Sequence, residues 1–150
     1  PPDDGERPRA SAVRSDGGRR GTGAGEGCVT GHRGAAGRAT ADVVDCRGIG
    51  EHDRLLGITD IGWMMGPWAI CGALTIGATL VLFDGVPDHP GPDRLWSVVE
   101  RHRVTVLGIA PTVIRALMRT GDEPVAAHDL SSLRVLGSTG EPWNTASWPW

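Results

Sequence analysis

From residue 51 onward, apolar residues occur in short runs separated by polar turns. Four of these runs are four to six residues long, rich in Leu, Ile and Val, and they occupy residues 55–59, 78–83, 104–108 and 133–136. Short runs of this kind, bounded by turn residues, are typical of strands buried inside a parallel sheet. The pattern therefore predicts four strands in the last two-thirds of the chain.

Between the strands, apolar residues recur at the three- and four-residue spacing of amphipathic helices. Residues 93–103 show this spacing, and so do residues 111–120, where Pro111 suits the first position of a helix. The spaced residues are Leu95, Val98, Val99 and His102 in the first helix and Val113, Ile114, Leu117 and Met118 in the second. Strands that alternate with helices predict an α/β fold with a mostly parallel sheet and right-handed crossovers.

Residues 61–83 form an uncharged stretch of 23 residues, which is long enough for a transmembrane helix. The alternative is a buried helix of about 13 residues followed by the strand at residues 78–83. Several glycines and Pro67 interrupt the stretch, and its second part is short, β-branched and bounded by Gly77 and Asp84. These features favour the helix and strand, so no membrane span is expected.

Residues 1–50 differ from the rest of the chain in composition. They hold 12 of the 23 glycines and eight of the 15 arginines, and their apolar residues show no helical or strand period. We therefore expect an irregular or disordered Gly/Arg-rich segment at residues 1–50, ahead of a folded segment at residues 51–150. Gly21–Gly27 (GTGAGEG) partly matches a phosphate-binding glycine loop, but no apolar strand precedes it.

Charge and cysteine content exclude some classes of partner. The formal net charge of −3 gives no indication of nucleic acid, and all 15 basic residues are arginines. Cys28, Cys46 and Cys71 form no CxxC pair and no zinc-site spacing, so free thiols, no metal site and a cytoplasmic location are expected. The sequence starts Pro-Pro-Asp-Asp, without the apolar core of a signal peptide, in agreement with that location.

A candidate ligand site is the stretch VLGSTGEPWN, residues 135–144. Its glycines directly follow a predicted strand, and open α/β sheets bind ligands at the carboxyl ends of their strands. A glycine-rich turn at this position also has a purely steric explanation, since many strands end in such turns. From these residues alone, both interpretations stay open.

Several sequence blocks in a fixed order bear on this question. They are TDIGWMMGPW (59–68), GATLVLFDGVPDHP (77–90), HRVTVLGIAPTVIRALMRTGDEPV (102–125) and HDLSSLRVLGSTGEPWN (128–144). Through these blocks, residues 51–150 resemble the acetyl-CoA synthetase branch of the AMP-forming acyl-CoA synthetases. The resemblance implies a fragment of the large N-terminal AMP-binding domain of an adenylate-forming enzyme.

Such enzymes join a carboxylate to ATP, release pyrophosphate and then pass the acyl group to the thiol of coenzyme A. The resemblance therefore implies a short-chain carboxylate such as acetate, ATP and coenzyme A as partners, and Mg²⁺ bound by residues outside this sequence. A carboxylate that attacks an anionic phosphate needs cationic groups and backbone amides where the charge develops. This requirement explains why the family surrounds its nucleotide with such groups.

The resemblance also implies roles for individual residues. Gly140, Glu141 and Pro142 match the family segment that lies against adenine; Trp63, Met64 and Thr139 match the wall of the acyl pocket; and Met65 and Asp88 match positions near the thiol arm of coenzyme A. Pro111 and Thr112 match a strand-to-helix turn with a structural role. Met65 stands where acetyl-CoA synthetases commonly have threonine, and Met64 and Met65 together imply a pocket of altered shape, which leaves the acyl substrate open.

Other family motifs have no counterpart in this sequence. The Ser/Thr/Gly-rich phosphate loop is expected just before residue 30, where the chain instead has GTGAGEGCVTGH. The acid and arginine that hold magnesium and ribose, and the adenylation lysine, also lack counterparts. We therefore expect an acyl-CoA synthetase fragment with no catalytic residues of its own, inactive in isolation. The alternative is a non-catalytic remnant that at most binds a nucleotide or a partner.

Overall fold

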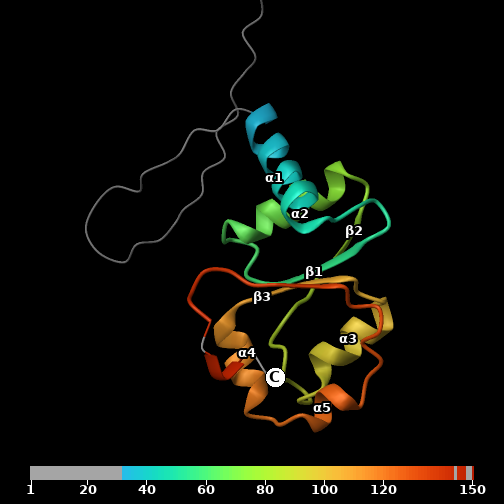
Figure 1. The fold of residues 1–150 in the computed structure, drawn as a ribbon, viewed down its shortest axis with the longest axis vertical. Helices are drawn as coiled ribbons and strands as arrows, with labels where there is room; N and C mark the ends of the chain where they lie inside the picture. The colour runs from blue at the N-terminus through green and yellow to red at the C-terminus, as the bar shows by residue number, and fades with distance from the viewer. Residues whose placement is uncertain (1–31, 144, 148–149) are drawn as a thin grey trace, which may run out of the picture.

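The computed structural model describes residues 32–143, 145–147 and 150 of the chain. Within this part, the chain folds into one parallel sheet of four strands with helices on both faces (Figure 1). The strands are β1 (Arg54–Ile58), β2 (Thr79–Val81), β3 (Val106–Ile109) and β4 (Val135–Gly137), in the spatial order β2-β1-β3-β4. All three strand pairings are parallel, which confirms the predicted α/β fold.

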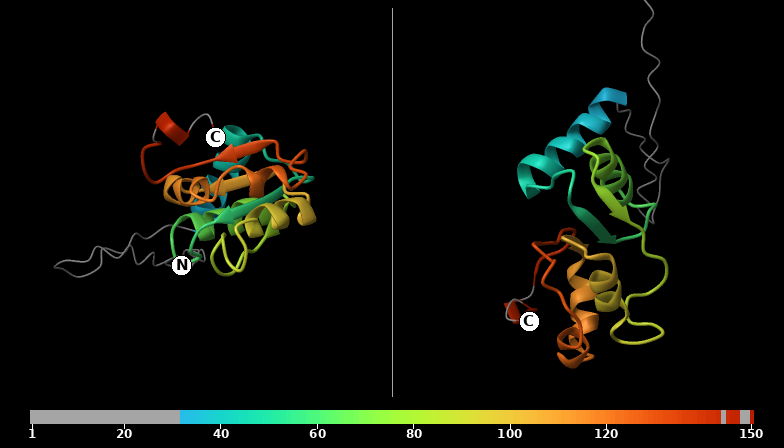
Figure 2. Two further views of the ribbon diagram at one scale, coloured as in Figure 1. Left: turned by 90° about the horizontal axis from the view of Figure 1, so that it is seen from below. Right: turned by 90° about the vertical axis from the view of Figure 1, so that its right-hand side faces the viewer.

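Helices cover both faces of the sheet, as the ribbon views show (Figures 1 and 2). The helices α1 (His32–Arg47) and α2 (Met65–Thr75) lie on one face, and α3 (Arg94–His102) and α4 (Pro111–Met118) lie on the other. Two short elements complete the fold, the helix α5 (Glu123–Ala126) and the 3₁₀-helix η1 (Thr145–Ser147). The sheet is therefore the middle layer of three.

Side chains that alternate along the strands give each helical layer its own core. On β1, Leu55 packs in the cluster of the α1–α2 face and Leu56 in the cluster of the α3–α4 face, and both are buried. On β3, Val106 and Leu107 are their partners in register and repeat the same alternation. Strands buried on both faces explain the continuous apolar runs in the sequence.

The expectation of irregular structure for residues 1–50 is wrong over His32–Arg47, which forms α1. The rest of that segment up to residue 31, with Gly21–Gly27, lies outside the described residues, and a domain boundary at residue 50 stays a prediction. The sequence of α1 shows no clear period of apolar residues, because the side chains that the helix buries are short. Ala39 and Val43 are buried there, while Val44 is exposed.

Packing between α1 and α2 depends on the absence of a side chain at Gly72. A Cβ atom built there would lie 2.5 Å from Cγ2 of Val43 and 3.2 Å from the carbonyl oxygen of Ala39. Real Cβ contacts of 2.5 Å essentially never occur. Close approach of two backbones, rather than an apolar stripe, therefore holds α1 in place.

The uncharged stretch of residues 61–83 divides into α2 and β2, as the non-membrane interpretation expected. The α2 helix has 11 residues, and the described part of the chain contains no helix long and apolar enough to cross a membrane. In α3, Leu95 and Val99 are buried as predicted, but His102 is exposed. The apolar stripe of α3 therefore ends one turn before the helix does.

A polar network ties three strands together at their amino ends. The carboxylate of Asp53 accepts hydrogen bonds from the Thr105 hydroxyl at 2.6 Å and the Gly50 amide at 2.8 Å, and it pairs with Arg134 at 2.8 Å. Burial by itself raises the pKa of Asp53, but hydrogen bonds from Thr105, Gly50 and Arg134 outweigh it and hold that pKa below its ordinary value. This network lies at the opposite end of the strands from the candidate site.

Candidate functional site

The chain changes direction between the neighbouring strands β1 and β3. After β1, α2 leads to β2 at one edge of the sheet, and after β3, α4 leads across the opposite face to β4 at the other edge (Figure 1). Connections that diverge in this way leave a crevice at the carboxyl ends of the two strands. The strand order alone therefore places a candidate site at the ends of β1 and β3.

A cavity of about 80 Å³ lies at this point. Its walls come from the ends of β1, β3 and β4 and from the first turns of α2, and they include Met65, Trp68, Ile109 and Thr139. Pockets for drug-sized ligands measure roughly 300–1,000 Å³, so this cavity accommodates only a small group. Its largely apolar lining, with a few hydroxyls, suits a short alkyl chain next to a polar atom.

Two of the sequence-predicted residues meet in this cavity. Met65, assigned by resemblance to the coenzyme A side, and Thr139, assigned to the acyl pocket, both line it. Trp63 and Met64 do not line it, and they are 64 % and 74 % exposed on the turn before α2. Asp88 lies exposed in the loop between β2 and α3. The described structure therefore joins two of these five residues and leaves the other three apart.

The turn after β4 contains Gly140, Glu141 and Pro142, the predicted adenine segment. Gly140 has a φ of +99°, a conformation that favours glycine. The carboxylate of Glu141 accepts hydrogen bonds from the amide of Thr112 at 3.0 Å and from its hydroxyl, and lies 2.7 Å from Nη2 of Arg115. The turn is thus anchored to the first two turns of α4.

This anchor also caps α4. The residue at the cap position, Ala110, has no side chain that can accept from the free amides of the first turn. The carboxylate of Glu141, 29 positions after Thr112, accepts from the Thr112 amide instead. Hydrogen bonds from Thr112, and then from Arg115, hold the pKa of Glu141 below its ordinary value. Neither Thr112 nor Arg115 was predicted from the sequence as a partner of Glu141. A usable signal was the helix start Ala-Pro-Thr, which lacks a capping residue of its own.

A second, larger cleft of about 650 Å³ adjoins the cavity. Ile58 and Thr59, at the end of β1, line both spaces. The cleft then continues between Gly66 at the start of α2 and the residues Asp84 and Gly85 that follow β2. The loop that carries Asp88 therefore begins at the edge of this cleft.

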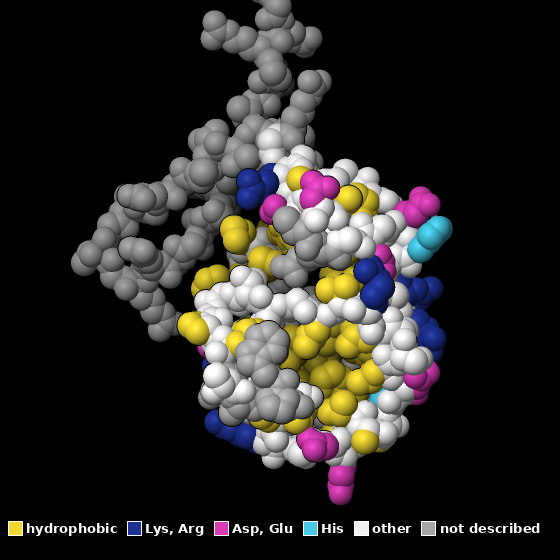
Figure 3. All heavy atoms as spheres, in the orientation of Figure 1, with side chains coloured by type: hydrophobic (Ala, Val, Ile, Leu, Met, Phe, Trp, Pro, Cys, Tyr) yellow, Lys and Arg dark blue, Asp and Glu magenta, His cyan; other side chains and the backbone are white. Residues whose placement is uncertain are grey.

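The opposite face of the sheet carries an apolar hollow of about 690 Å³ under β4 (Figure 3). Its lining includes Trp96, Ile114, Leu136 and Trp143, and Leu136 is 50 % exposed. Ser138 lines both this hollow and the small cavity. Among the described residues, the hydroxyl of Ser138 alone is a buried side-chain polar atom without a hydrogen-bond partner.

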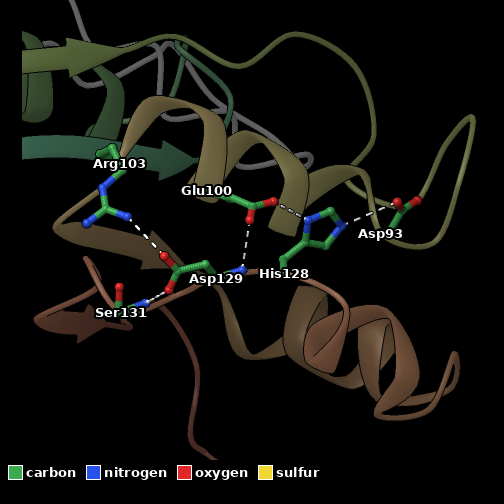
Figure 4. A network of polar contacts seen from close by, with 6 residues as sticks. All are labelled: Asp93, Glu100, Arg103, His128, Asp129 and Ser131. Atoms are coloured by element: carbon green, nitrogen blue, oxygen red, sulfur yellow. Dashed lines mark hydrogen bonds and ion pairs between the residues drawn. The ribbon is translucent and has the colours of Figure 1, made fainter.

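A polar network that is not part of the cavity lining lies between α3 and the segment that follows α5 (Figure 4). Nδ1 of His128 lies 2.7 Å from Glu100, and its Nε2 lies 3.4 Å from Asp93. Asp129 donates its amide to Glu100 at 3.1 Å and pairs with Arg103 at 3.1 Å. The hydrogen bond with Glu100 raises the pKa of His128, although desolvation opposes it, and the same bond lowers the pKa of Glu100. This network holds α3 against the chain leading to β4.

The described residues offer little to a metal ion. No group of three or more His, Cys, Asp or Glu side chains among them could hold one, and Cys71 is free and exposed. The residues present therefore do not fit a Mg²⁺ site, and we derive no reaction step through that ion.

Comparison with known proteins gives this geometry a context. The chain is 52 % identical to the acetyl-coenzyme A synthetase of Rubrobacter xylanophilus over 92 residues, which are 61 % of this chain and 14 % of that protein. It is 48 % identical to the acetyl-coenzyme A synthetase of Phycomyces blakesleeanus over 101 residues, which are 67 % of this chain and 15 % of that protein. The chain thus spans about one-seventh of the length of these relatives.

A solved structure shares the fold. Acetoacetyl-CoA synthetase from Streptomyces lividans matches with a TM-score of 0.77 and 30 % sequence identity, over 86 % of this chain and 20 % of that one. The family of AMP-binding enzymes matches residues 21–150, which extends the similarity 30 residues upstream of residue 51, where the resemblance seen in the sequence begins. The expected resemblance is therefore confirmed, and the chain belongs to the AMP-binding enzyme family.

Proposed function

We propose that this chain supplies part of the adenine and acyl sites of an AMP-forming acyl-CoA synthetase. The overall reaction is that of an acid–thiol ligase, in which acetate or another short-chain carboxylate, ATP and coenzyme A give acyl-CoA, AMP and pyrophosphate. The observation that carries the proposal is the small cavity at the ends of β1 and β3, which Thr139 lines beside the anchored turn Gly140–Pro142. The family match and the relatives' names support the same conclusion.

Each part of the site has a physical role under this proposal. The backbone of Gly140 and Pro142 offers a flat surface against which adenine packs, while Glu141 fixes that surface to α4. Thr139 places a hydroxyl at the junction of this turn and the cavity, and Met65, which the resemblance places on the coenzyme A side, lines the same cavity. The unpaired hydroxyl of Ser138 is consistent with a polar ligand atom nearby, because buried hydroxyls are rarely left without a partner.

The outer residues have roles that depend on further protein. We place Trp63 and Met64 beside the acyl pocket and Asp88 beside the thiol arm of coenzyme A, on the sequence resemblance alone. Exposed as they are, Trp63 and Met64 form a wall only when another segment covers them. ATP phosphates and Mg²⁺ are then bound by residues other than those described. We therefore expect ligand binding without turnover.

Calorimetric titration of the chain with AMP and with a non-hydrolysable acetyl-adenylate mimic tests the proposal. Both should bind in the millimolar range or below, and the mimic should bind roughly fourfold tighter, the value of one buried methyl group. Thr139→Trp, which fills the cavity, should remove the advantage of the mimic and retain AMP binding. Glu123→Gln, an exposed change on α5, is the matched control and should alter neither affinity.

Two outcomes would contradict the proposal in different ways. If neither ligand gives heat at millimolar concentration, the result would favour the non-catalytic remnant. If both ligands bind with equal affinity, the small cavity does not bind the acyl group. Pyrophosphate release from acetate, ATP and Mg²⁺ by the isolated chain would contradict the expected inactivity.

A further inference from the structure

The loop between β2 and α3, residues 84–92, closes around a single arginine. Arg94 is the first residue of α3, and its guanidinium donates three hydrogen bonds to backbone carbonyls of this loop. Nη1 bonds to Val86 and His89, each at 2.9 Å, and Nη2 bonds to Asp84 at 2.6 Å. One side chain therefore contacts the start, the middle and the later part of the loop.

Two further contacts restrict the same guanidinium. Its carbon lies 4.7 Å from the centre of the Phe83 ring, in the geometry of a cation–π interaction. Gly85 has a φ of +89°, and a Cβ atom built there would lie 2.9 Å from Nη1 of Arg94. The chain thus bends around the guanidinium at a position where a side chain would collide with it.

Arginine has the chemistry that this arrangement needs. Its planar guanidinium presents five N–H donors in a rigid fork, so it can reach several carbonyls at once and stack on an aromatic ring. A lysine ammonium places all its donors on one atom and cannot span carbonyls on both sides of the fork. The hydrogen bonds are charge-assisted, which makes them stronger than bonds between neutral groups.

A backbone hydrogen bond also joins the loop to α3, and its strength depends on the position of the loop. The amide of Leu95 donates to the carbonyl of Pro87 at 3.1 Å, and therefore joins the helix to the loop. Two residues further along, the amide of Ser97 donates to Asp93 at 2.9 Å within the helix. These two amides lie in the same turn of α3, but only the first depends on the position of the loop.

We propose that Arg94 is a positioning residue that holds residues 84–92 in one conformation and thereby sets the place of Asp88. Through Asp84 and Gly85, this loop forms one wall of the 650 Å³ cleft that adjoins the cavity. The part of the inference that concerns coenzyme A rests on the proposed function, which places Asp88 at the thiol arm. The part that concerns the order of the loop stands on the contacts of Arg94 alone.

Amide hydrogen exchange and ¹⁵N spectra of the whole chain test the loop. In Arg94→Ala, the Leu95 amide should exchange roughly tenfold faster or more, while the Ser97 amide keeps its rate. Arg94→Lys should restore little of the protection, because it retains the charge and not the fork. Arg101→Ala, an exposed change near the other end of α3, is the control and should leave both rates unchanged.

The same spectra separate this inference from the proposed function. Coenzyme A added to the wild type should shift the Asp88 amide, and Arg94→Ala should lose that response while Gly140 still responds to AMP. A loosened loop in Arg94→Ala with no wild-type response to coenzyme A would retain the loop-holding role and reject the coenzyme A assignment. An unchanged Leu95 rate in Arg94→Ala, or full protection in Arg94→Lys, would overturn the role of the guanidinium. If Arg94→Ala does not fold, the exchange rate of the Leu95 amide in Arg94→Lys alone tests the role of the guanidinium.

Discussion

The two faces of the sheet are covered by helices that pack in different ways. On the α3–α4 face, the buried helical residues are mostly large: Leu95, Trp96, Val99, Ile114 and Leu117. On the α1–α2 face, they are small or short: Val43, Ala69 and Ala73, with Gly72 at the crossing. The first layer is stabilised by a large apolar area, and the second by close approach of two backbones.

This difference determines what each layer tolerates. A layer built on large side chains loses stability when atoms are removed, because each removal forfeits burial and leaves a cavity. A layer in which two helix backbones approach closely loses stability when atoms are added, because neither helix can accommodate the added atoms without moving. The same helix-on-sheet architecture therefore has opposite sensitivities on its two faces.

The largest effect is expected from Leu117→Ala on α4. Leu117 is fully buried, so truncation should lower the free energy of unfolding by about 2–5 kcal/mol. Urea unfolding monitored by tryptophan fluorescence measures the change. Leu74→Ala, at a 61 % exposed position of α2, is the matched control and should cost less than about 0.5 kcal/mol. Equal losses in the two variants would show that burial of Leu117 does not stabilise the α3–α4 layer.

A smaller loss, of about 1–3 kcal/mol, is expected from Gly72→Ala on α2. The added methyl group would lie 2.5 Å from Val43, so α1 must shift. Adding Val43→Ala should recover part of the loss, since it removes the colliding atom. Gly37→Ala on α1, where a Cβ meets nothing within 4 Å, should instead stabilise by up to about 1 kcal/mol. Unchanged stability in Gly72→Ala would show that α1 is not held by this crossing.

The contrast between the layers also explains which parts of the fold could be predicted. The α3 and α4 helices and the four strands leave a periodic or continuous apolar signal, so their positions and the parallel sheet follow from the sequence. The α1 helix leaves none, because Ala39 and Val43 pack through close contact and carry no stripe. The buried face of α1 can be recognised only once the structure shows Gly72 of α2 packed against it.

The candidate site shows the same limit in another form. Spacing and resemblance pointed to the turn after β4, and the strand order independently pointed to the adjacent ends of β1 and β3, where Thr139 lines the small cavity. The helix start Ala-Pro-Thr indicates that α4 lacks a cap of its own, but the sequence does not show that Glu141 supplies it. Thr112 lies 29 positions from Glu141 and meets it only through the parallel pairing of β3 with β4. The exposure of Trp63 likewise depends on tertiary structure.

A pH-dependent effect is expected at His128, on the α3–α4 face. The pKa of His128 is raised above its ordinary value of 6.5 in the folded chain, so its pairing with Glu100 and Asp93 stabilises fully below that value and is lost as pH rises through the raised pKa. His128→Gln should therefore lower the thermal midpoint more at pH 6 than at pH 9. His102→Gln, at an exposed position of α3, is the matched control variant at both pH values. An equal loss for His128→Gln at both values would contradict the pairing.

The smallest change in stability is expected at Glu141, where the α4 layer meets the turn after β4. In Glu141→Gln the amide oxygen can still accept from Thr112, but Arg115 loses its anionic partner, so the thermal midpoint should fall only slightly at neutral pH. The pKa of Glu141 is lowered from 4.5, so its contribution is present above that value and is lost as pH falls through the lowered pKa. The difference between wild type and variant should consequently narrow below pH 4.5. A difference that stays constant down to pH 3 would mean that shape, rather than charge, anchors the turn to α4.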